Sequence, residues 1–273
     1  MKILVTGANS YLGGRLYQDL KEDFETYGTY NRERLFPELV KLDMADSKGI
    51  FSVIKQINPE VIVHAAAVPT SKLCEDNPKM AFEINVKGTE KILDAGRESG
   101  AKMIFISTGG AAQPYDVYTE TKAKAEVAVK THEDYVILRP AFVLGSSPNR
   151  ESDRQQNRLL KNILQGIPAS YDNTTKMQAT WIGHISEVIK MCIEKGISGE
   201  TIPIVADEKH TRFEISREIL GHFEIECTPI NGELRTIPLE TTETLKRLRL
   251  PVYNYNEVID KVVAEIQEVI GKS

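Results

Sequence analysis

The sequence contains few of the residues that mark secreted, metal-binding or membrane-spanning proteins. Its 273 residues include three cysteines, Cys74, Cys192 and Cys227, which lie far apart. An odd number of scattered cysteines without ligand spacing favours free thiols in a reducing cytoplasm over disulfides or a metal site. No apolar run approaches the roughly 20 residues that span a bilayer, and no secretory signal precedes the first apolar segment. We therefore expect a cytoplasmic protein with no metal and no membrane partner.

The chain also lacks an excess of positive charge. Its 34 lysines and arginines face 39 aspartates and glutamates, which gives a formal net charge of -5. This balance argues against nucleic acid as a general partner, although it does not exclude a local basic pocket. The length and a hydrophobic content of 41% suffice for one large or two small domains with a buried core.

A turn rich in small residues follows the first apolar segment. Lys2–Thr6 reads as a buried strand, residues 7–14 as a turn, and Arg15–Leu20 as a helix. Glycines in such a turn let a phosphate approach the backbone, and the helix N-terminus attracts an anion. Ser10 replaces the usual middle glycine of a dinucleotide-binding turn. The predicted cofactor contacts here are Gly7, Asn9, Ser10, Tyr11, Leu12 and Gly13.

The end of the second predicted strand, Glu25–Tyr30, indicates which dinucleotide binds. In such folds a carboxylate at this point holds the ribose hydroxyl of NAD, whereas an arginine suits the 2′-phosphate of NADP. Asn31 and Arg32 follow the strand directly, and no acid precedes them. We therefore predict NADP, held by Asn31 and Arg32. Glu33 keeps NAD as an alternative, and Arg34 reads as an exposed charge.

Strands and helices alternate through the first half of the chain. Further strands are predicted at Glu38–Leu42, Val61–His64, Lys102–Ile106 and Tyr135–Leu138, and the intervening helices at Ile50–Ile57, Met80–Ala95 and Tyr118–Lys130. This alternation predicts an α/β fold of the Rossmann type, a doubly wound parallel sheet with helices on both faces. Ligands of such sheets bind beyond the carboxyl ends of the strands. The residues expected there are Asp43, Met44, Ala65, Ala66, Ala67, Ser107, Thr108 and Pro140.

A tyrosine and a lysine four residues apart open the helix after the fifth strand. Tyr118 and Lys122 would share one helix face, which places an ammonium beside a phenol. A free tyrosine has a pKa of about 10, and a nearby cation lowers it toward neutrality. The pair therefore predicts a proton-transfer group. On their own these residues fit a solvated helix face as well. His64, on an apolar run, reads as a packed residue.

The second half of the chain is less regular. A polar loop from Ser146 leads to predicted helices at Gln156–Gln165, Ile185–Glu194, Thr211–Phe223, Glu240–Leu248 and Tyr255–Ile270, with one strand at Thr201–Val205. We predict that residues 1–145 form the dinucleotide-binding domain and that 180–206 return to it. Residues 146–179 and 207–273 are then a smaller, discontinuous α/β substrate domain.

Several short motifs, spread over most of the chain, match a single family. They are Thr6-Gly7-Ala8, His64-Ala65-Ala66-Ala67, Asn85-Val86-Lys87-Gly88-Thr89, Ile106-Ser107-Thr108, Tyr118-x-x-x-Lys122 and Leu138-Arg139-Pro140. Together they resemble the extended short-chain dehydrogenase/reductases that act on nucleotide-activated sugars. Thr180-Trp181-Ile182 and Ile202–Val205 look closest to dTDP-4-dehydrorhamnose reductase-like members.

The resemblance implies roles for individual residues. Tyr118 would donate a proton to a keto oxygen while NADPH delivers a hydride, and Lys122 would hold the nicotinamide ribose. Either Thr108 or Ser107 would hydrogen-bond the substrate oxygen. Asn85 would contact the cofactor or support Lys122, and a buried structural amide is the alternative. Arg139 would pair with a pyrophosphate or brace its loop.

The implied function is an NADP-dependent reductase of a nucleotide-linked 4-keto-6-deoxysugar in cell-surface polysaccharide synthesis. Gly109-Gly110 follow Thr108 where related dehydratases carry an acid pair, which argues against a 4,6-dehydratase. A sugar C4 epimerase with the same residues and a non-catalytic NADP-binding regulatory subunit are the alternatives. The expected partner is a nucleotide sugar, and a homodimer is left open.

Overall fold

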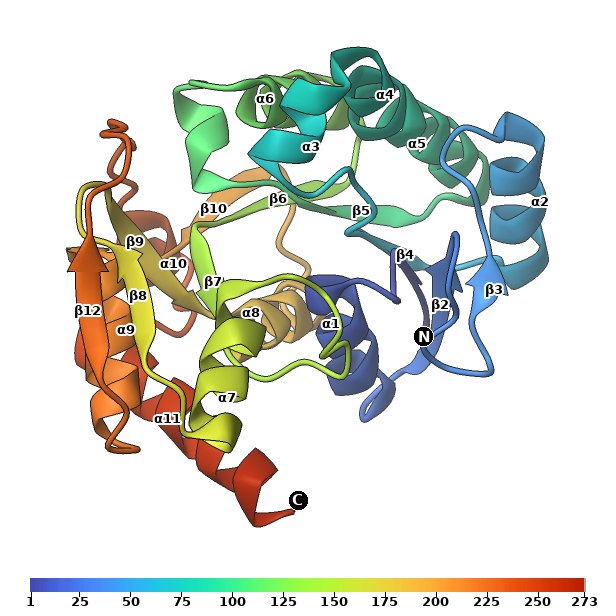
Figure 1. Cartoon of the computed structure of the whole chain (residues 1–273). Coiled ribbons are helices and arrows are strands. Elements are labelled where there is room, and N and C mark those ends of the chain that lie inside the picture. Colours follow the sequence, from blue (N-terminus) through green and yellow to red (C-terminus); the bar gives the residue numbers. More distant parts are fainter. Residues whose placement is uncertain (273) are drawn as a thin grey trace.

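The structure, a computed structural model, describes residues 1–272 and centres on one parallel sheet (Figure 1). The seven strands, in spatial order, are β10 (Glu200–Ile204), β6 (Tyr135–Pro140), β5 (Lys102–Ile106), β4 (Val61–His64), β1 (Lys2–Thr6), β2 (Glu25–Tyr30) and β3 (Val40–Lys41). Every neighbouring pair in this sheet runs parallel. The predicted Rossmann-type fold is therefore confirmed.

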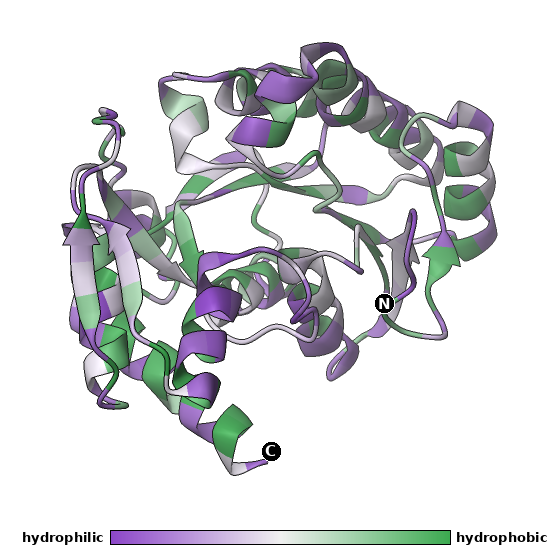
Figure 2. Ribbon diagram, in the orientation of Figure 1, coloured by the Kyte–Doolittle hydropathy of each residue, from purple (hydrophilic) through white to green (hydrophobic). Residues whose placement is uncertain are grey.

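Helices cover both faces of the sheet because its strands are apolar on both faces. In β1, Ile3 and Val5 pack toward α1 (Tyr11–Lys21) and α8 (Ile182–Glu194), whereas Leu4 packs toward the opposite layer. Successive side chains of a strand point to opposite faces, so one short run supplies two cores. Figure 2 shows apolar residues gathered on the strands and on the inward sides of the helices. The opposite layer consists of α2 (Ser47–Ile57), α5 (Gly88–Ser99) and α6 (Val117–Val129).

The helix predicted at Met80–Ala95 is not a single α-helix. Two short helices, α3 (Ser71–Asp76) and α4 (Pro78–Phe82), lead into a π-helical turn, Glu83–Lys87, before α5 begins. In this wider turn the Gly88 N–H reaches the carbonyl of Glu83, five residues back. Such π turns often mark functional sites, and this one contains Asn85.

Most of the remaining elements form a smaller unit at the carboxyl edge of the main sheet. It contains a three-stranded sheet, β7 (Phe142–Leu144), β9 (Lys176–Trp181) and β11 (Lys209–Thr211), and a two-stranded one, β8 (Ala169–Asp172) with β12 (Cys227–Ile230). Its helices are α7 (Gln155–Gln165), α9 (Arg212–Gly221) and α11 (Tyr255–Gly271), whereas α10 (Glu243–Arg247) packs against β10 of the main sheet through Leu245. A separate hydrophobic core holds β7, β8, β9, α7, α9 and α11 together.

Two predicted elements are shorter than expected. The strand predicted at Glu38–Leu42 is reduced to Val40–Lys41, since only Thr29 and Tyr30 of β2 pair with it at the sheet edge. The helix predicted at Glu240–Leu248 begins at Glu243 because Glu240 leaves the helix to bond Gln178 and Arg139.

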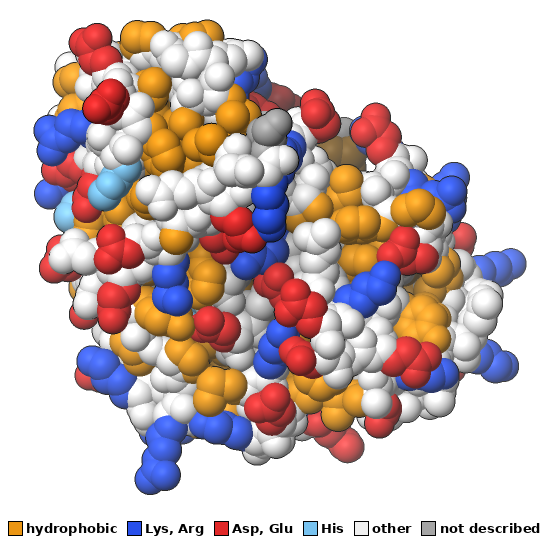
Figure 3. Space-filling model, turned by 90° about the horizontal axis from the view of Figure 1, so that it is seen from below, with side chains coloured by type: hydrophobic (Ala, Val, Ile, Leu, Met, Phe, Trp, Pro, Cys, Tyr) orange, Lys and Arg blue, Asp and Glu red, His pale blue; other side chains and the backbone are white. Residues whose placement is uncertain are grey.

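On the face of the molecule seen from below, acidic and basic side chains are interspersed, so neither sign of charge dominates that face (Figure 3). Within residues 1–272, no helix combines the length and the apolar character needed to cross a bilayer.

Candidate active site

A cleft of about 870 Å³ lies where the carboxyl ends of the main strands face the smaller unit. This volume falls in the usual range for small-molecule sites. Most of the residues that the sequence predicts for the site line it: Gly7, Asn9, Ser10, Tyr11, Leu12, Asn31, Arg32, Asp43, Met44, Ala65, Ala66, Ala67, Ser107, Thr108, Tyr118, Lys122 and Pro140. Gly13 and Asn85 lie outside this lining.

The turn after β1 leaves no room for larger side chains. Gly7 has φ +72°, and a Cβ there would lie 2.9 Å from the Ala66 Cα. A Cβ at Gly13 would lie 2.2 Å from the Gly7 carbonyl oxygen, so Gly13 shapes the turn from outside the cleft. Ser10 is the N-cap of α1, and its hydroxyl accepts a hydrogen bond from the Gly13 N–H at 3.0 Å. The serine that replaces glycine thus keeps the turn closed. The tight turn and the adjoining helix N-terminus fit a dinucleotide pyrophosphate.

The small residues that follow β4, residues 65–67, come directly after a buried histidine, His64. His64 is fully buried, with Nδ1 2.7 Å from the Thr6 hydroxyl and Nε2 3.0 Å from the Thr89 hydroxyl. Burial and the nearby Lys122 charge lower the pKa of His64 to about 3. The imidazole is therefore neutral, and His64 is the packed residue that the sequence predicts. The Thr6 hydroxyl also accepts from the Ala66 N–H at 3.2 Å, which fixes the strand end beside the glycine turn.

The tyrosine–lysine pair sits at the start of α6. Asp116 and Thr119 form a capping box that fixes this end of the helix, and Tyr118 and Lys122 both face the cleft. Lys122 is only 2% exposed, and its Nζ lies 3.9 Å from the centre of the Phe105 ring. Burial lowers the pKa of Lys122 to about 7.

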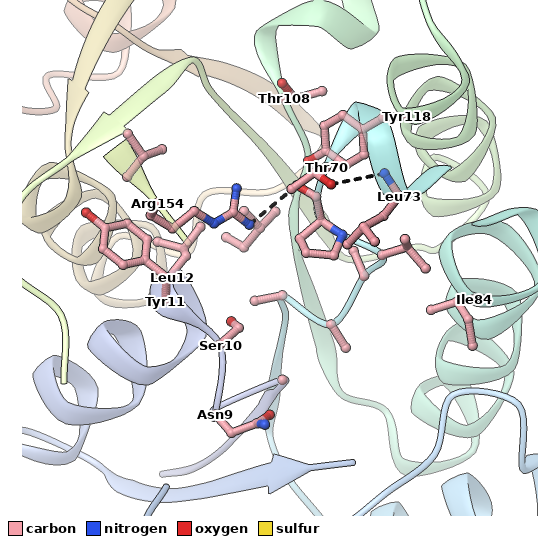
Figure 4. A pocket seen from close by; sticks show the side chains of 18 of the residues that line it. Asn9, Ser10, Tyr11, Leu12, Thr70, Leu73, Ile84, Thr108, Tyr118 and Arg154 are labelled. Carbon is pink, nitrogen blue, oxygen red and sulfur yellow. Dashed lines mark hydrogen bonds between the residues drawn. The ribbon is translucent and has the colours of Figure 1, made fainter. Parts of the chain in front are cut away.

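The electrostatic prediction for Tyr118 was wrong. Burial raises the pKa of Tyr118 to about 12, and the cation that opposes this rise is Arg154 instead of Lys122. Arg154 precedes α7, and its Nη2 reaches the Pro69 carbonyl at 3.4 Å, so it links the two walls of the cleft (Figure 4). Sequence spacing identifies only neighbours on the same helix, whereas Arg154 approaches from the smaller unit.

The two candidate hydroxyls differ in their surroundings. Ser107 is 3% exposed, and its hydroxyl donates to Glu126 at 2.5 Å. The Thr108 hydroxyl makes no hydrogen bond to any residue in the described part of the chain, and Thr108 faces the cleft with Tyr118 (Figure 4). Thr108 is therefore the hydroxyl that can meet a ligand.

Asn85 does not reach the cleft. Its side chain is 1% exposed and holds the backbone of Val68, whose N–H donates to Oδ1 at 2.7 Å. Its Nδ2 donates to the Thr121 hydroxyl at 3.0 Å. The predicted contact between Asn85 and the cofactor is therefore corrected. Asn85 is a buried structural amide that joins the loop after β4 to α6.

Arg139 braces the protein interior. It makes two hydrogen bonds to Glu126, at 2.6 and 2.9 Å, and one to Glu240 at 3.3 Å. With both carboxylates around its guanidinium, and a place outside the cleft lining, Arg139 is not placed to pair with a pyrophosphate.

The sequence analysis missed the cations on the facing wall. Arg154, Arg158 and Arg212 all line the cleft. Arg158 pairs with Asp153 at 2.6 Å, whereas Arg154 and Arg212 form no salt bridge with a described residue. Arg154 lies just before α7 and Arg212 is the first residue of α9, and only this position at the start of a helix could have indicated them from the sequence.

The strand-end cleft, the glycine turn and the tyrosine–lysine pair are the features of NAD(P)-dependent oxidoreductases of the extended short-chain dehydrogenase/reductase type. The chain belongs to the family described as RmlD substrate binding domain, whose model matches residues 1–254. The family membership predicted from the motifs is thus confirmed.

Individual relatives are distant. Methionine adenosyltransferase 2 subunit beta from Xenopus laevis is 24% identical over 255 residues, which are 85% of this chain and 76% of that protein. dTDP-4-dehydrorhamnose reductase from Aggregatibacter actinomycetemcomitans is 27% identical over 217 residues, 74% of this chain and 70% of the relative. The crystal structure of dTDP-4-dehydrorhamnose reductase from Bacillus anthracis, in complex with NADP, superposes with a TM-score of 0.80 at 18% identity and covers 98% of both chains.

Proposed function

We propose that this protein is a cytoplasmic, NADP-dependent reductase of a nucleotide-linked 4-keto-6-deoxysugar that serves cell-surface polysaccharide synthesis. The observation that carries the proposal is that Tyr118, Lys122 and Thr108 line the same cleft as the glycine turn. A carbonyl placed between them would meet a proton donor and a hydrogen-bond donor together.

The cofactor would extend along the strand ends. Gly7, Ser10 and the start of α1 would take its pyrophosphate, Arg32 its 2′-phosphate and Lys122 its nicotinamide ribose. When bound, NADPH supplies the hydride that reduces the carbonyl carbon. NAD is the second choice, since Glu33 lies beside Arg32.

The nucleotide part of the substrate would lie against the facing wall. A nucleotide sugar carries a diphosphate, and arginine is the side chain best suited to bind phosphate oxygens. Arg154 and Arg212 line that wall and form no salt bridge within the described part of the chain. They are therefore the cations best placed to receive the diphosphate.

Proton transfer would start from a neutral phenol. Burial raises the pKa of Tyr118 to about 12, so Tyr118 keeps its proton at neutral pH. Its O–H would donate that proton to the substrate oxygen, and the Thr108 hydroxyl would hydrogen-bond the same oxygen. Gly109 and Gly110, in the turn after Thr108, bring no acid–base pair for elimination of water.

The test is a panel of nucleotide 4-keto sugars incubated with NADPH or NADH. Wild-type protein should consume NADPH, and Tyr118→Phe should lower kcat by about 10²–10⁴-fold through loss of general acid catalysis. Tyr115→Phe is the matched control, because Tyr115 is 42% exposed and lies outside the cleft lining. An unchanged rate in Tyr118→Phe would remove Tyr118 from the mechanism. Interconversion of two sugars without net NADPH consumption would indicate an epimerase.

A second candidate is a non-catalytic NADP-binding subunit. The observation in its favour is the similarity to methionine adenosyltransferase 2 subunit beta over 85% of this chain. This candidate predicts that NADPH binds, as measured by fluorescence, while no member of the sugar panel is reduced.

A further inference from the structure

One buried carboxylate in α6 has no part in the chemistry described so far. Glu126 is 3% exposed and lies one helical turn after Lys122. It stays outside the cleft lining, so it touches neither the cofactor site nor the substrate site. Burying a carboxylate costs folding free energy unless charged or hydrogen-bonding partners surround it. The partners of Glu126 therefore indicate its role.

Glu126 connects one of the two candidate hydroxyls, that of Ser107, to the protein interior. The Ser107 hydroxyl donates to Oε1 at 2.5 Å, and Arg139 donates to both carboxylate oxygens. With its hydroxyl turned to Glu126, Ser107 does not compete with Thr108 for a ligand. Glu240, from the segment before α10, closes the cluster on the other side of Arg139 at 3.3 Å.

Glu126 and Lys122 lie four residues apart in α6, so they share one helix face, and both are buried. The groups around the ammonium are the Phe105 ring of β5, the neutral His64 of β4, the Cys74 thiol of α3 and Tyr118 of α6. Burial raises the pKa of the Cys74 thiol to about 11, so that thiol is uncharged at neutral pH. Burial lowers the pKa of Lys122, and Glu126 is the first cause that opposes this effect.

We propose that Glu126 is a positioning residue of the active site: its carboxylate faces Lys122 from the next turn of α6 and turns the Ser107 hydroxyl away from the substrate. The proposal rests on the proposed function, in which the Lys122 ammonium holds the nicotinamide ribose. When Tyr118 donates its proton, the phenol O–H bond breaks, a new O–H bond forms on the substrate, and a phenolate remains. Arg154, the cation whose charge opposes burial at Tyr118, stabilises that phenolate until water returns the proton.

The test is Glu126→Gln in the full chain, a change that keeps the side-chain shape and removes the charge. Without the carboxylate the pKa of Lys122 falls further below its usual value, so Lys122 loses its proton at lower pH. The alkaline limb of the pH profile of kcat/KM should move down by about one unit, since an opposite charge nearby shifts a pKa by roughly 1–3 units. Activity should fall about tenfold above the limb and little below it.

Two further variants separate charge from structure. Glu240→Gln removes a carboxylate that bonds Arg139 but does not contact Lys122, so the limb should stay in place. Glu126→Asp keeps the charge one methylene farther away and should move the limb by less than Glu126→Gln. If Glu126→Gln does not fold, Glu126→Asp carries the test. A limb that stays in place in the folded variant, with activity reduced equally at all pH values, would show a purely structural role and overturn the proposal.

A readout without turnover keeps this proposal distinct from the proposed function. The acetylation rate of Lys122 by acetic anhydride, followed by mass spectrometry across pH, reports the pKa of Lys122 in the ligand-free protein. Glu126→Gln should shift this titration to lower pH by the same amount as the limb. If no keto sugar is reduced but the titration shifts, the reductase proposal fails while the effect of Glu126 on Lys122 stands. If the titration of Lys122 does not shift in Glu126→Gln, the proposed effect of Glu126 on Lys122 is overturned, even if the enzyme is active.

Discussion

The two walls of the cleft differ in the regularity of the backbone that carries their side chains. The dinucleotide wall is built from the ends of parallel strands and the start of α6, so the sheet register determines where Gly7, Ala66 and Thr108 lie. The facing wall presents Arg154, which ends the long loop before α7, and Arg212, which begins α9 directly after the short strand β11. Strand ends hold a shared cofactor in one place, whereas loops can vary with the substrate. Under the proposed function, the cofactor would therefore bind to the first wall, and the second wall would select the sugar.

The walls also differ in how their arginines are paired. Behind the dinucleotide wall, the Arg139 side chain is 16% exposed and its partner Glu126 is 3% exposed. On the facing wall, Arg158 and Asp153 form a pair with exposures of 55% and 76%. Water screens the exposed Arg158–Asp153 pair but not the buried Arg139–Glu126 pair. Removing the arginine should therefore cost much more stability in the buried pair than in the exposed one.

Arg139→Met should produce the largest loss of stability. It leaves the Glu126 and Glu240 carboxylates in the interior without a cation, which typically costs about 3–5 kcal/mol. Arg158→Met, the matched change on the facing wall, should cost less than about 1 kcal/mol. Urea unfolding of both variants measures the difference. Equal losses would show that the two pairs are screened alike and would break the comparison.

The cofactor preference gives a smaller effect, confined to the dinucleotide wall. Arg32→Ala should weaken NADPH binding about tenfold, roughly 1.4 kcal/mol, and leave NADH binding unchanged, because only NADPH carries the 2′-phosphate. Arg34→Ala is the control, since Arg34 lies over the Tyr30 ring at 5.9 Å and outside the cleft lining. Fluorescence titration with both cofactors measures the dissociation constants. A preference of the wild type for NADH would contradict the role of Arg32.

Sequence patterns located the dinucleotide wall and missed the facing one for a physical reason. Continuous apolar runs such as Val61–His64 and Lys102–Ile106 matched β4 and β5 residue for residue. In contrast, β8 reads Ala-Ser-Tyr-Asp and gave no strand signal, because its neighbours in space set its pairing.

The uncertain parts of the site were those that depend on distant residues. Adjacent residues of a strand point to opposite sides, so either Ser107 or Thr108 could face a ligand. Glu126, distant in sequence, decides between them by binding Ser107. The pKa of Tyr118 likewise depends on its burial and on Arg154, and neither can be read from the Tyr118–Lys122 spacing.

Helix caps give the smallest expected effect and reverse the comparison. Asp46, at the N-cap position of α2 in the dinucleotide-binding part, makes no side-chain capping bond, whereas Thr211 caps α9 in the smaller unit through a capping box with Glu214. Thr211→Ala should therefore cost about 1 kcal/mol. Asp46→Ala removes only a charge near a helix N-terminus and should cost about 0.3 kcal/mol. Urea unfolding at matched pH measures both. A larger loss of unfolding free energy for Asp46→Ala would mean that the Asp46 carboxylate caps α2 in solution. The helix caps of the smaller unit would then be no stronger than those of the dinucleotide-binding part.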